Sequence, residues 1–415
     1  MNYETRETPR EERQFRGGLP NKLSFVLGLV IGIMLMAGIT GAHAIYARQF
    51  RAGQTDPTTK VREIYSILSR HSMLEFDMEH LLNSMYRGLI GGLGDSNAQY
   101  MDARSFAAFT QRIGGTFVGI GVQVMISPED GKVTVVTVFR GAPAEGAGML
   151  VGDKITHVDG VDVYGMLLQE VVGMITGREN TDVTLTIYRP YEDDVFEIEI
   201  TRRRVEIPSI DFAEFEHEGV NIGYIQIMTF DSLTYRQFNE ALSILSEAGV
   251  SGIVIDVRNN SGGLLSQVNR ITNRLIPEGI VTFTENAAGE RIYYNSDENF
   301  LDIPMVVLVN NRSASASEIL SGAVQDKGVG TIVGENTFGK GTVQQTFELS
   351  DGSAISITVL KYFTPNGTSI EGVGIIPDIY VEMGEELSRL VGRLTLEEDV
   401  QLQKALEVIF DKVSD

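Results

Sequence analysis

From residue 221 onward, apolar segments of strand length alternate with amphipathic segments, and this alternation constrains the fold of the 415-residue chain more than any other feature. The segments NIGYIQIMTF, GIVIDVRNN and IPMVVLVN are each followed by a segment with helical spacing, of which YRQFNEALSILSEAG is the first. Strands that are buried on both faces and separated by helices form a mostly parallel sheet covered by helices. The sequence therefore predicts an α/β core whose functional residues lie at strand ends.

A second block, residues 114–190, has the period of strands and is punctuated by glycine. It contains GTFVGIGVQVMI, GKVTVVTVF and DVTLTIYR, with a short helical segment around LLQEVVGMITG. The stretch FVGIGV predicts a glycine-containing loop whose backbone N–H groups can bind the terminal carboxylate of a peptide while a strand edge pairs with that peptide. A plain hairpin turn is the simpler interpretation of this loop when it is taken alone.

The N-terminal part of the chain predicts a membrane segment followed by helices. No Asp, Glu, Lys or Arg occurs between Leu23 and Ala47, and the first 18 residues of this stretch are almost wholly apolar, which approaches the ~20 residues that span a bilayer. Basic residues precede the stretch, so we expect a cytoplasmic N-terminus and the bulk of the chain on the periplasmic or extracellular side. The sequence AHA at 42–44 leaves signal cleavage after Ala44 as the alternative to an uncleaved anchor.

Composition excludes several classes of function. The chain has 34 Lys+Arg against 56 Asp+Glu, a net charge of −22, and such a surface repels nucleic acid. It has no cysteine, so disulfides, thiolate metal ligands and a cysteine nucleophile are excluded. Its five histidines are scattered, without the spacing of a zinc site. We therefore expect no nucleic-acid partner, no metal and no cofactor.

The segment GENTFGKGT, residues 334–342, is one residue short of a phosphate-binding P-loop. A P-loop has Ser or Thr directly after its lysine, and a helix whose N-terminus faces the phosphates. Lys340 is instead followed by Gly341 and a segment with strand character, so nucleotide binding is disfavoured. The uncharged neighbours of Lys340 are compatible with a desolvated lysine, whose pKa burial would lower toward that of a usable base.

The segment NNRSASASEIL, residues 310–320, joins the end of a buried strand to the start of a helix. A serine at such a junction presents its hydroxyl at the sheet edge, beside a helix N-terminus that stabilises developing negative charge. An N-cap is the structural alternative for any one of these serines, but three serines in five residues exceed what a cap needs. We expect a serine nucleophile, for which Lys340 is a candidate base and a distant histidine is the alternative.

Taken together, these segments resemble the carboxyl-terminal processing proteases, also called tail-specific proteases. SASASEI and VGENTFGKGTVQQ resemble the catalytic segments of that family, and GGTFVGIGV resembles the entry to its PDZ domain. GIVIDVRNNSGGLL resembles its D-x-R-x-N-P-G-G-x-L segment, and YFTPNGTSIEGVGIIPDI resembles its closing strand region. One departure is Ser261, where the family commonly has proline, although the glycine pair that follows is kept.

The resemblance implies a Ser-Lys dyad. In this chain the nucleophile would be Ser315, and Lys340, 25 positions later, would be the base, with Gln344 helping to orient it. The resemblance also implies an oxyanion hole made by the backbone N–H groups of Gly262 and Ala316. Ser313 and Ser317 would then be cap or lining residues.

The resemblance further implies a PDZ domain set against a crotonase-like α/β protease core. Together with the N-terminal membrane helix and the helical segment expected from the residues, this predicts a multidomain α+β fold. We expect a cytoplasmic stub with a membrane anchor or signal at 1–50, a helical region at 51–112, the PDZ domain at 113–190, the protease core at 191–384 and a C-terminal helical tail at 385–415. The PDZ loop expected to bind the substrate tail consists of Phe117, Val118, Gly119, Ile120, Gly121 and Val122.

The predicted function is that of an extracytoplasmic serine endopeptidase that recognises apolar C-terminal tails of protein substrates through its PDZ domain and processes them. A homodimer is a further expectation from the resemblance. The alternative is a non-catalytic PDZ adaptor that has retained a protease-like fold. That alternative predicts the loss of Ser315 or Lys340, and both residues are present.

Overall fold

The computed structural model describes residues 56–414, and the chain divides into two compact units, residues 1–81 and 82–415. The membrane helix predicted between Leu23 and Ala47 lies outside the described residues. None of the helices within residues 56–414 is long and apolar enough to cross a membrane. In the first unit, α2 (Pro57–His71) begins after Asp56, whose carboxylate accepts the N–H of Thr58 at 3.0 Å and so caps the helix.

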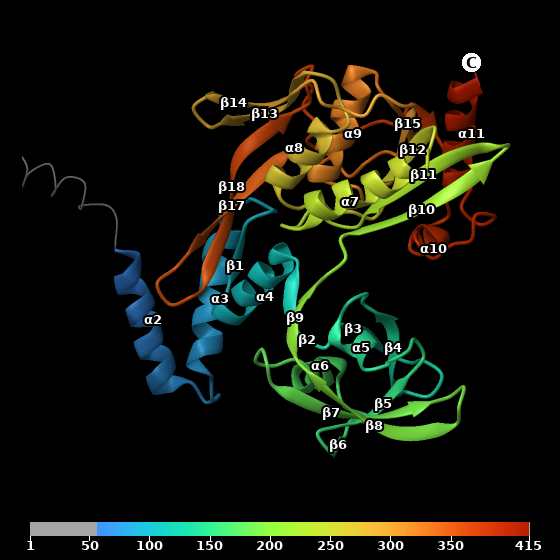
Figure 1. The fold of residues 1–415 in the computed structure, drawn as a ribbon. Coiled ribbons are helices and arrows are strands. Elements are labelled where there is room, and N and C mark those ends of the chain that lie inside the picture. Colours follow the sequence, from blue (N-terminus) through green and yellow to red (C-terminus); the bar gives the residue numbers. More distant parts are fainter. Residues whose placement is uncertain (1–55, 415) are drawn as a thin grey trace, which may run out of the picture. The chain divides into compact units, whose positions relative to one another are not determined.

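The central sheet of the second unit is built from strands separated by helices, as the alternation predicts (Figure 1). Its order is β10-β11-β12-β15-β16-β19, in which β10 is antiparallel to β11 and all other neighbours are parallel. Ile225 and Ile255 pack with α7, α8 and α9, whereas Tyr224 and Val254 pack with α11. Helices therefore cover both faces, which is why these strands are apolar throughout. The elements are β10 (Ile210–His217), β11 (Val220–Ile227), α7 (Thr234–Glu247), β12 (Gly252–Asp256), α8 (Leu265–Asn273), β15 (Met305–Val309), α9 (Ala316–Lys327), β16 (Thr331–Gly334), β19 (Ile379–Tyr380), α10 (Glu385–Ser388) and α11 (Val400–Ser414).

A second sheet of the same unit has the order β1-β18-β13-β14, with β17 also paired to β18. Its register between β17 and β18 shifts between Val343 and Gln344, which marks a β-bulge. The short strand β1 pairs with the start of β18, so residues that precede the glycine-punctuated block join a sheet formed late in the chain. The elements are α3 (Met78–Gly91), β1 (Gln99–Met101), α4 (Ala103–Gly114), β13 (Gly279–Asn286), β14 (Arg291–Ser296), β17 (Thr342–Glu348) and β18 (Ala354–Phe363).

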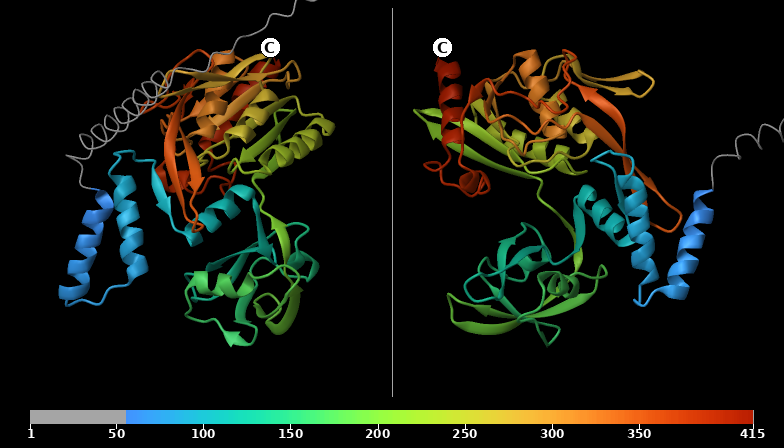
Figure 2. Two further views of the ribbon diagram at one scale, coloured as in Figure 1. Left: turned by 90° about the vertical axis from the view of Figure 1, so that its left-hand side faces the viewer. Right: turned by 180° about the vertical axis from the view of Figure 1, so that it is seen from behind.

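The glycine-punctuated block forms a separate sheet of order β3-β4-β5-β7-β8, with β6 paired to β5 (Figure 2). Among the strands of residues 56–414, β3 pairs only with β4, so its other edge is open there. The chain enters this domain through β2 and leaves through β9, and these two strands pair with each other. The elements are β2 (Thr116–Gly119), β3 (Val122–Ile126), β4 (Val133–Val138), α5 (Pro143–Gly146), β5 (Lys154–Val158), β6 (Val161–Asp162), α6 (Leu168–Ile175), β7 (Asp182–Arg189), β8 (Asp194–Thr201) and β9 (Arg203–Glu206).

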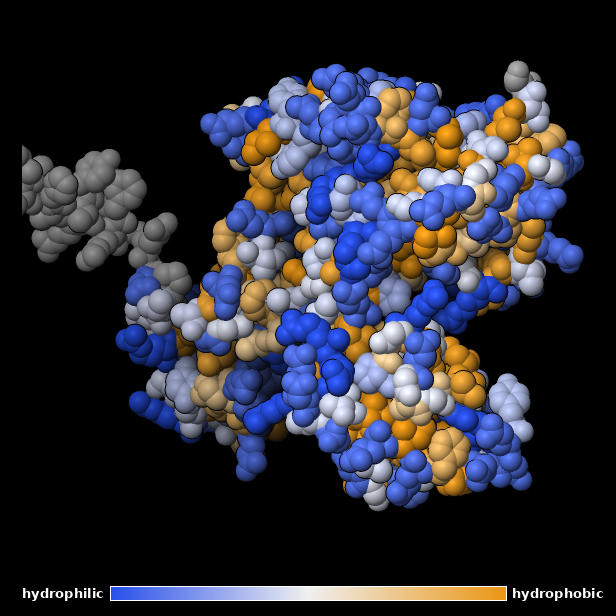
Figure 3. Space-filling model, in the orientation of Figure 1, coloured by the Kyte–Doolittle hydropathy of each residue, from blue (hydrophilic) through white to orange (hydrophobic). Residues whose placement is uncertain are grey.

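Hydrophobic residues also reach the surface of this domain, as the orange atoms over its visible face show (Figure 3). Leu167, Val172 and Val195 are among its exposed apolar side chains.

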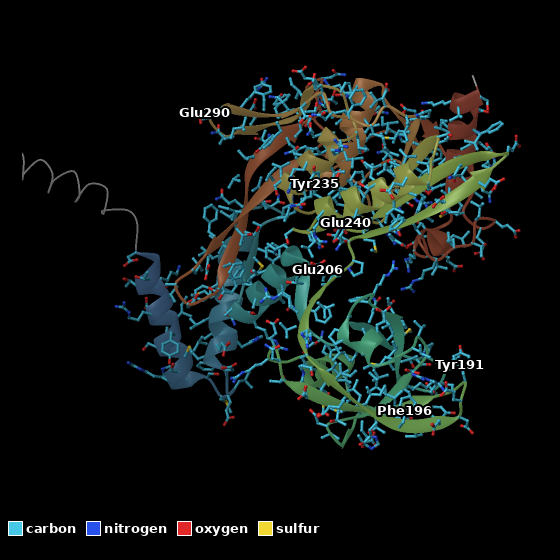
Figure 4. The ribbon with its side chains drawn as sticks, in the orientation of Figure 1. Tyr191, Phe196, Glu206, Tyr235, Glu240 and Glu290 are labelled. Carbon is cyan, nitrogen blue, oxygen red and sulfur yellow. The ribbon has the colours of Figure 1, made fainter. Side chains whose placement is uncertain are left out.

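The exit strand β9 is tied to the first turn of α7 by an ion-pair network. Arg236 pairs with Glu206 at the end of β9 and with Glu240 one turn further along α7, at 2.9 Å for the second pair. Both glutamates are labelled in Figure 4. All three side chains are about half exposed, so the network contributes little to stability and chiefly favours one orientation of the connection.

The D-x-R part of the GIVIDVRNN segment forms a buried ionic cluster. The Arg258 guanidinium donates to Asp256 at 2.6 Å and to Asp399 at 2.8 Å, and none of the Arg258 side chain is exposed. The Tyr224 hydroxyl donates to the same oxygen of Asp256, Oδ2, at 2.7 Å. Asp399 immediately precedes α11, so this cluster fixes the C-terminal helix against the central sheet. Removal of one partner would leave an unpaired buried charge, at a cost of about 3–5 kcal/mol.

Candidate active site

Ser315 lies where the chain passes from β15 into α9. Its φ of 56° and ψ of −112° place it in a region of backbone conformation that residues other than glycine rarely adopt. Such strain persists only where the surrounding structure holds it, and it is concentrated at functional sites. Ser315 is half-buried, so its side chain reaches a cavity rather than the core.

The flanking serines are buried and their hydroxyls are committed to the backbone. Ser313 Oγ donates to the carbonyl of Val257 at 2.8 Å, and Ser317 Oγ donates to the carbonyl of Asn260 at 2.9 Å. Among the described residues, the Ser315 hydroxyl makes no hydrogen bond to the backbone, and the Tyr362 hydroxyl is a side-chain neighbour of it. Of the three serines, Ser315 alone therefore combines access to the cavity with a hydroxyl that is not bound to the backbone.

Lys340 lies in the loop between β16 and β17, and the residue that begins the next element is Thr342. A strand rather than a helix follows the lysine, so the structure lacks the helix N-terminus that a P-loop needs at this position. The flanking glycines allow the loop to approach residues 371–374 closely. A Cβ at Gly341 would lie 2.8 Å from the backbone nitrogen of Glu371, and one at Gly339 would lie 3.0 Å from that of Gly374.

Partial burial lowers the pKa of Lys340 below its ordinary value. The carboxylates of Glu371, Asp95 and Glu318 act in the opposite direction, because they stabilise the ammonium form. Burial has the larger effect, so a greater share of the neutral amine is present at a given pH than for an exposed lysine.

Glu318 joins the backbones of Ser315 and Lys340 through a single carboxylate. Its Oε2 accepts the N–H of Ser315 at 2.7 Å and the N–H of Lys340 at 2.9 Å. Its Oε1 accepts the Thr337 hydroxyl at 2.6 Å and the N–H of Gly339 at 2.7 Å. Burial raises the pKa of the Glu318 carboxyl, and these four donors oppose that effect. Glu318 thus fixes the serine and the lysine relative to each other.

Tyr362, from β18, makes the matching connection through carbonyl groups. Its hydroxyl lies within hydrogen-bond distance of the carbonyl oxygens of Ser315, at 3.0 Å, and of Lys340. Burial raises the pKa of Tyr362 well above its ordinary value, so the hydroxyl keeps the proton that it donates. The backbones on both sides of the candidate dyad are therefore held at their N–H groups and at their carbonyls.

Ser315 and Lys340 line one cavity of about 820 Å³. Among the described residues, no hydrogen bond joins Lys340 Nζ to Ser315 Oγ. The apolar part of the lining comes from α4, from the start of α8 and its preceding loop, and from α9 and β17. These residues include Phe106, Phe109, Ile113, Leu264, Leu265, Ile319 and Val343.

The two predicted oxyanion-hole donors lie next to the serine but differ in availability. Ala316 opens α9, and no acceptor is paired with its N–H among the described residues. Gly262 approaches so closely that a Cβ on it would lie 2.8 Å from Ser315 Cβ. Its N–H, however, donates to Asn260 Oδ1 at 2.8 Å. The structure thus holds one free donor and one donor that is already bound.

Gln344 lies in β17, directly after the bulge, and lines the same cavity as Lys340. Its amide Nε2 donates to the hydroxyls of Thr342 and Thr358, each at 3.1 Å. Its role in orienting Lys340 stays a prediction, because no hydrogen bond between Gln344 and Lys340 is present among the described residues.

The predicted tail-binding loop, Phe117 to Val122, runs from β2 to the open edge strand β3. Gly121 has a φ of 85°, and a Cβ on it would lie 2.2 Å from Ala142 Cβ, so only glycine fits. No acceptor is paired with the N–H groups of Ile120 and Gly121 among the described residues. A groove beside this loop is lined by Val122, Val124, Val172, Ile175 and Arg204, among others, from β3, α6 and β9.

Sequence reasoning missed Glu318 and Tyr362. The spacing of Ser315 and Glu318 is that of a capping box, in which an acidic side chain returns to the N–H of the cap residue, so a signal for Glu318 existed. Nothing in the sequence around Tyr362 marks it, because its partners are carbonyl groups that lie 47 and 22 residues away.

Comparison with known proteins identifies two matching families. Residues 221–381 match peptidase family S41, and residues 134–189 match a PDZ domain. The "Carboxyl-terminal-processing protease" of Synechocystis sp. is 38% identical over 297 residues, which cover 71% of this chain and 69% of the relative. "Carboxy-terminal processing protease CtpB" of Bacillus subtilis is 33% identical over 345 residues, which cover 83% of this chain and 71% of the relative. A solved structure of a putative S41 protease from Bacteroides fragilis, 17% identical, has a TM-score of 0.50 and covers 83% of this chain and 94% of its own, in agreement with the fold.

Proposed function

The chain belongs to the carboxyl-terminal processing proteases of peptidase family S41, and on this premise we propose that Ser315 and Lys340 are its catalytic dyad. The chain is accordingly a serine-type endopeptidase with a PDZ domain, and the non-catalytic adaptor is not supported. One observation carries the assignment of the dyad. Glu318 Oε2 accepts the N–H of both residues, and this connects the one serine of the segment whose hydroxyl is not bound to the backbone to a partly buried lysine.

In the proposed reaction, the neutral amine of Lys340 accepts the proton of Ser315 Oγ as the oxygen attacks the carbonyl carbon of the scissile bond. The carbonyl oxygen becomes an oxyanion that the Ala316 N–H stabilises. Gly262 contributes a second N–H once Asn260 releases it. Each donor of this kind is worth about 10²–10³ in rate.

Collapse of the tetrahedral intermediate breaks the peptide C–N bond, and the Lys340 ammonium returns its proton to the leaving amine. A water molecule then attacks the acyl-enzyme while Lys340 accepts a proton from it, and Ser315 Oγ leaves as the hydroxyl. Protons balance over the two half-reactions, and the proposed route uses only the chain, its substrate and the attacking water.

The PDZ groove is proposed to hold the C-terminal tail of the substrate. The unpaired N–H groups of Ile120 and Gly121 suit a terminal carboxylate, and the open edge of β3 suits an added strand. Val122 and Val172 in the lining favour apolar side chains at the end of the tail. Arg204 also lines the groove, and its guanidinium pairs with Glu179 at 3.8 Å. These features support the proposal that substrates end in apolar residues.

The place of action and the assembly are also proposals. We place the catalytic part on the extracytoplasmic side of a membrane, anchored through the uncharged stretch from Leu23 to Ala47, because basic residues precede that stretch. We further propose a homodimer. The helix α2 supports it, because apolar side chains such as Ile64 and Ile67 are exposed on it.

The proposed dyad is tested with the full-length chain in detergent micelles and an unfolded protein that ends in an apolar tail. We expect the parent to cleave it, and Ser315→Ala and Lys340→Ala each to lose at least about 10⁴-fold in rate, since removal of a catalytic nucleophile or base has effects of this size or larger. Products are identified by mass spectrometry. Ser317→Ala is the matched control, and it should retain cleavage. Full activity in Ser315→Ala would show that the assigned nucleophile is wrong.

A further inference from the structure

A turn that precedes the PDZ domain in sequence reaches the catalytic cavity. Asp95 and Asn97 lie between α3 and β1, and Asn97 is part of the cavity lining together with Ser315 and Lys340. Asp95 closes the turn, because its Oδ1 accepts the N–H of Asn97 at 2.9 Å. Its other oxygen, Oδ2, accepts the N–H of Thr358 in β18 at 3.1 Å.

The contact with Thr358 falls at a gap in the pairing of β18. On one side of this strand, β1 pairs with Ala354 to Ser356 and β13 pairs with Leu360 to Phe363. Thr358 lies between these two segments, and it is also the partner of Gln344 at the β-bulge. The Asp95 carboxylate thus takes a backbone N–H that neither neighbouring strand reaches, and it does so directly opposite Gln344.

The same turn also contacts the hydroxyls that fix Gln344. Asn97 Nδ2 donates to Thr342 Oγ1 at 3.4 Å, and Gln344 Nε2 donates to the hydroxyls of Thr342 and Thr358. A carboxamide has two N–H hydrogens and one oxygen, so two N–H bonds to the threonines determine where its oxygen points. Gln344 is therefore held through two residues that the turn itself holds.

We propose that the turn Asp95–Asn97 is a positioning element of the catalytic site, which fixes the amide of Gln344 beside Lys340 through Thr342 and Thr358. This inference rests on the proposed function, because it takes Lys340 to be the catalytic base. It gives the segment between α3 and β1 a part in catalysis without contact to the substrate.

Charge gives the turn a second effect on the same lysine. The charged groups that face Lys340 are Glu318 from α9, Glu371 from the loop after β18, and Asp95 from the turn. Partial burial acts to raise the pKa of Asp95, but the N–H groups of Asn97 and Thr358, the Thr358 hydroxyl and the N–H of Ala98 outweigh it, so the pKa lies below its ordinary value. Asp95 is therefore ionised wherever Lys340 titrates, and its removal would favour the neutral amine.

The test uses the full-length chain in detergent micelles and compares Asp95→Asn and Asn97→Ala with the parent on one peptide substrate. We expect kcat to fall about tenfold or more, because displacement of a catalytic group by about 1 Å can cost about 10²-fold, while KM changes less than about twofold. In Asp95→Asn, the acid limb of kcat/KM should also move to lower pH, which a merely structural defect would not produce. Asp351→Asn is the matched control, because Asp351 also accepts a backbone N–H, that of Ser353 at 3.0 Å, in the turn that joins β17 to β18.

A double-mutant cycle with Gln344→Ala separates the proposed route from a general loss of stability. If the turn acts through Gln344, the effect of Asp95→Asn on kcat should largely disappear in the Gln344→Ala background. Additive effects, or an Asp95→Asn protein as active as Asp351→Asn, would overturn the inference and leave the dyad intact. Absence of cleavage by the parent itself would instead count against the proposed function.

Discussion

The catalytic centre and the PDZ groove differ in whether their backbone polar groups are hydrogen-bonded within the protein. Around the dyad, the N–H groups of Ser315 and Lys340 are bound by one carboxylate, and both carbonyls lie within hydrogen-bond distance of one tyrosine hydroxyl. In the groove, the N–H groups of Ile120 and Gly121 are unpaired among the described residues, and β3 has an open edge. The first region is closed by its own side chains, and the second is left to be completed by a ligand.

This difference follows from what each region must do. A nucleophile and its base work only in one relative geometry, so preorganisation by neighbouring groups lowers the barrier. A groove that accepts the tails of different proteins must bind the peptide main chain, which all tails share. Unpaired backbone groups in the groove can form hydrogen bonds with that main chain. The comparison predicts that changes near Glu318 lower the rate of chemistry, whereas changes near Gly121 lower affinity for the tail.

The largest effect among these is expected for Glu318→Gln. The carboxamide has one oxygen in place of two, so its NH2 group would face two of the four present donors, either Ser315 and Lys340 or Thr337 and Gly339. We expect kcat for a peptide substrate to fall about 10²-fold through misplacement of the dyad. The free energy of unfolding should fall by about 1–3 kcal/mol because of the buried unsatisfied groups.

Steady-state kinetics and denaturant unfolding measure the two parts of this prediction separately. Glu335→Gln is the control, because Glu335 lies in the same loop as Lys340 and its carboxylate accepts the N–H of Met383 at 2.9 Å rather than a group of the dyad. If Glu318→Gln retained parental kcat, the claim that Glu318 preorganises the catalytic centre would be wrong.

The sequence predicted the catalytic layer of the fold well, because buried strands carry their own signal. β11, β12 and β15 lie in the segments NIGYIQIMTF, GIVIDVRNN and IPMVVLVN, since burial on both faces makes every residue of such a strand apolar. The strand β1 could not be predicted in this way. It has three residues, too few to show the alternation of apolar and polar residues that marks a strand, and its partner β18 lies more than 250 residues away.

The residues of the candidate site likewise fall into those that the sequence indicates and those that it does not. Ser315 and Lys340 stand in segments of unusual composition, so they could be singled out, whereas the Asp95 turn is ordinary in sequence and gains meaning only from its contact with Thr358. The hydrogen bond that the Gly262 N–H makes could not be predicted from the sequence either. The proximity of Gly262 to Ser315 follows from the resemblance, but the hydrogen bond from its N–H to Asn260 depends on a local turn that the sequence pattern does not specify.

A smaller effect, confined to substrate affinity, is expected for Gly121→Ala. The new Cβ would meet Ala142 and displace the loop that presents the unpaired N–H groups. We expect KM to rise about tenfold or more for a substrate with a free terminal carboxylate, which is the loss expected for hydrogen bonds to a charged group. The same substrate with an amidated C-terminus should show little change.

Gly141→Ala is the matched control for the backbone effect alone. Gly141 has a φ of 73°, but a Cβ there would meet nothing within 4 Å, so this variant shares the conformational cost without the clash. Equal KM values for the two variants would show that the loop next to Gly121 does not bind the tail.

The smallest expected effect is a displacement of the pH profile rather than a loss of rate. Lys340 must be neutral to accept the proton of Ser315, so kcat/KM should rise with pH as the lysine deprotonates, and partial burial places this limb below the ordinary pKa of lysine. The Glu371 carboxylate raises the pKa of Lys340, so Glu371→Gln should move the limb to lower pH. The carboxamide oxygen can still accept the N–H of Gly341, which Glu371 now accepts at 2.6 Å, so the loop should keep its conformation. Profiles of kcat/KM against pH for the parent and Glu371→Gln measure the displacement. A limb that stayed in place, or moved to higher pH, would mean that a group other than Lys340 controls it, and the preorganised centre would then need a different base.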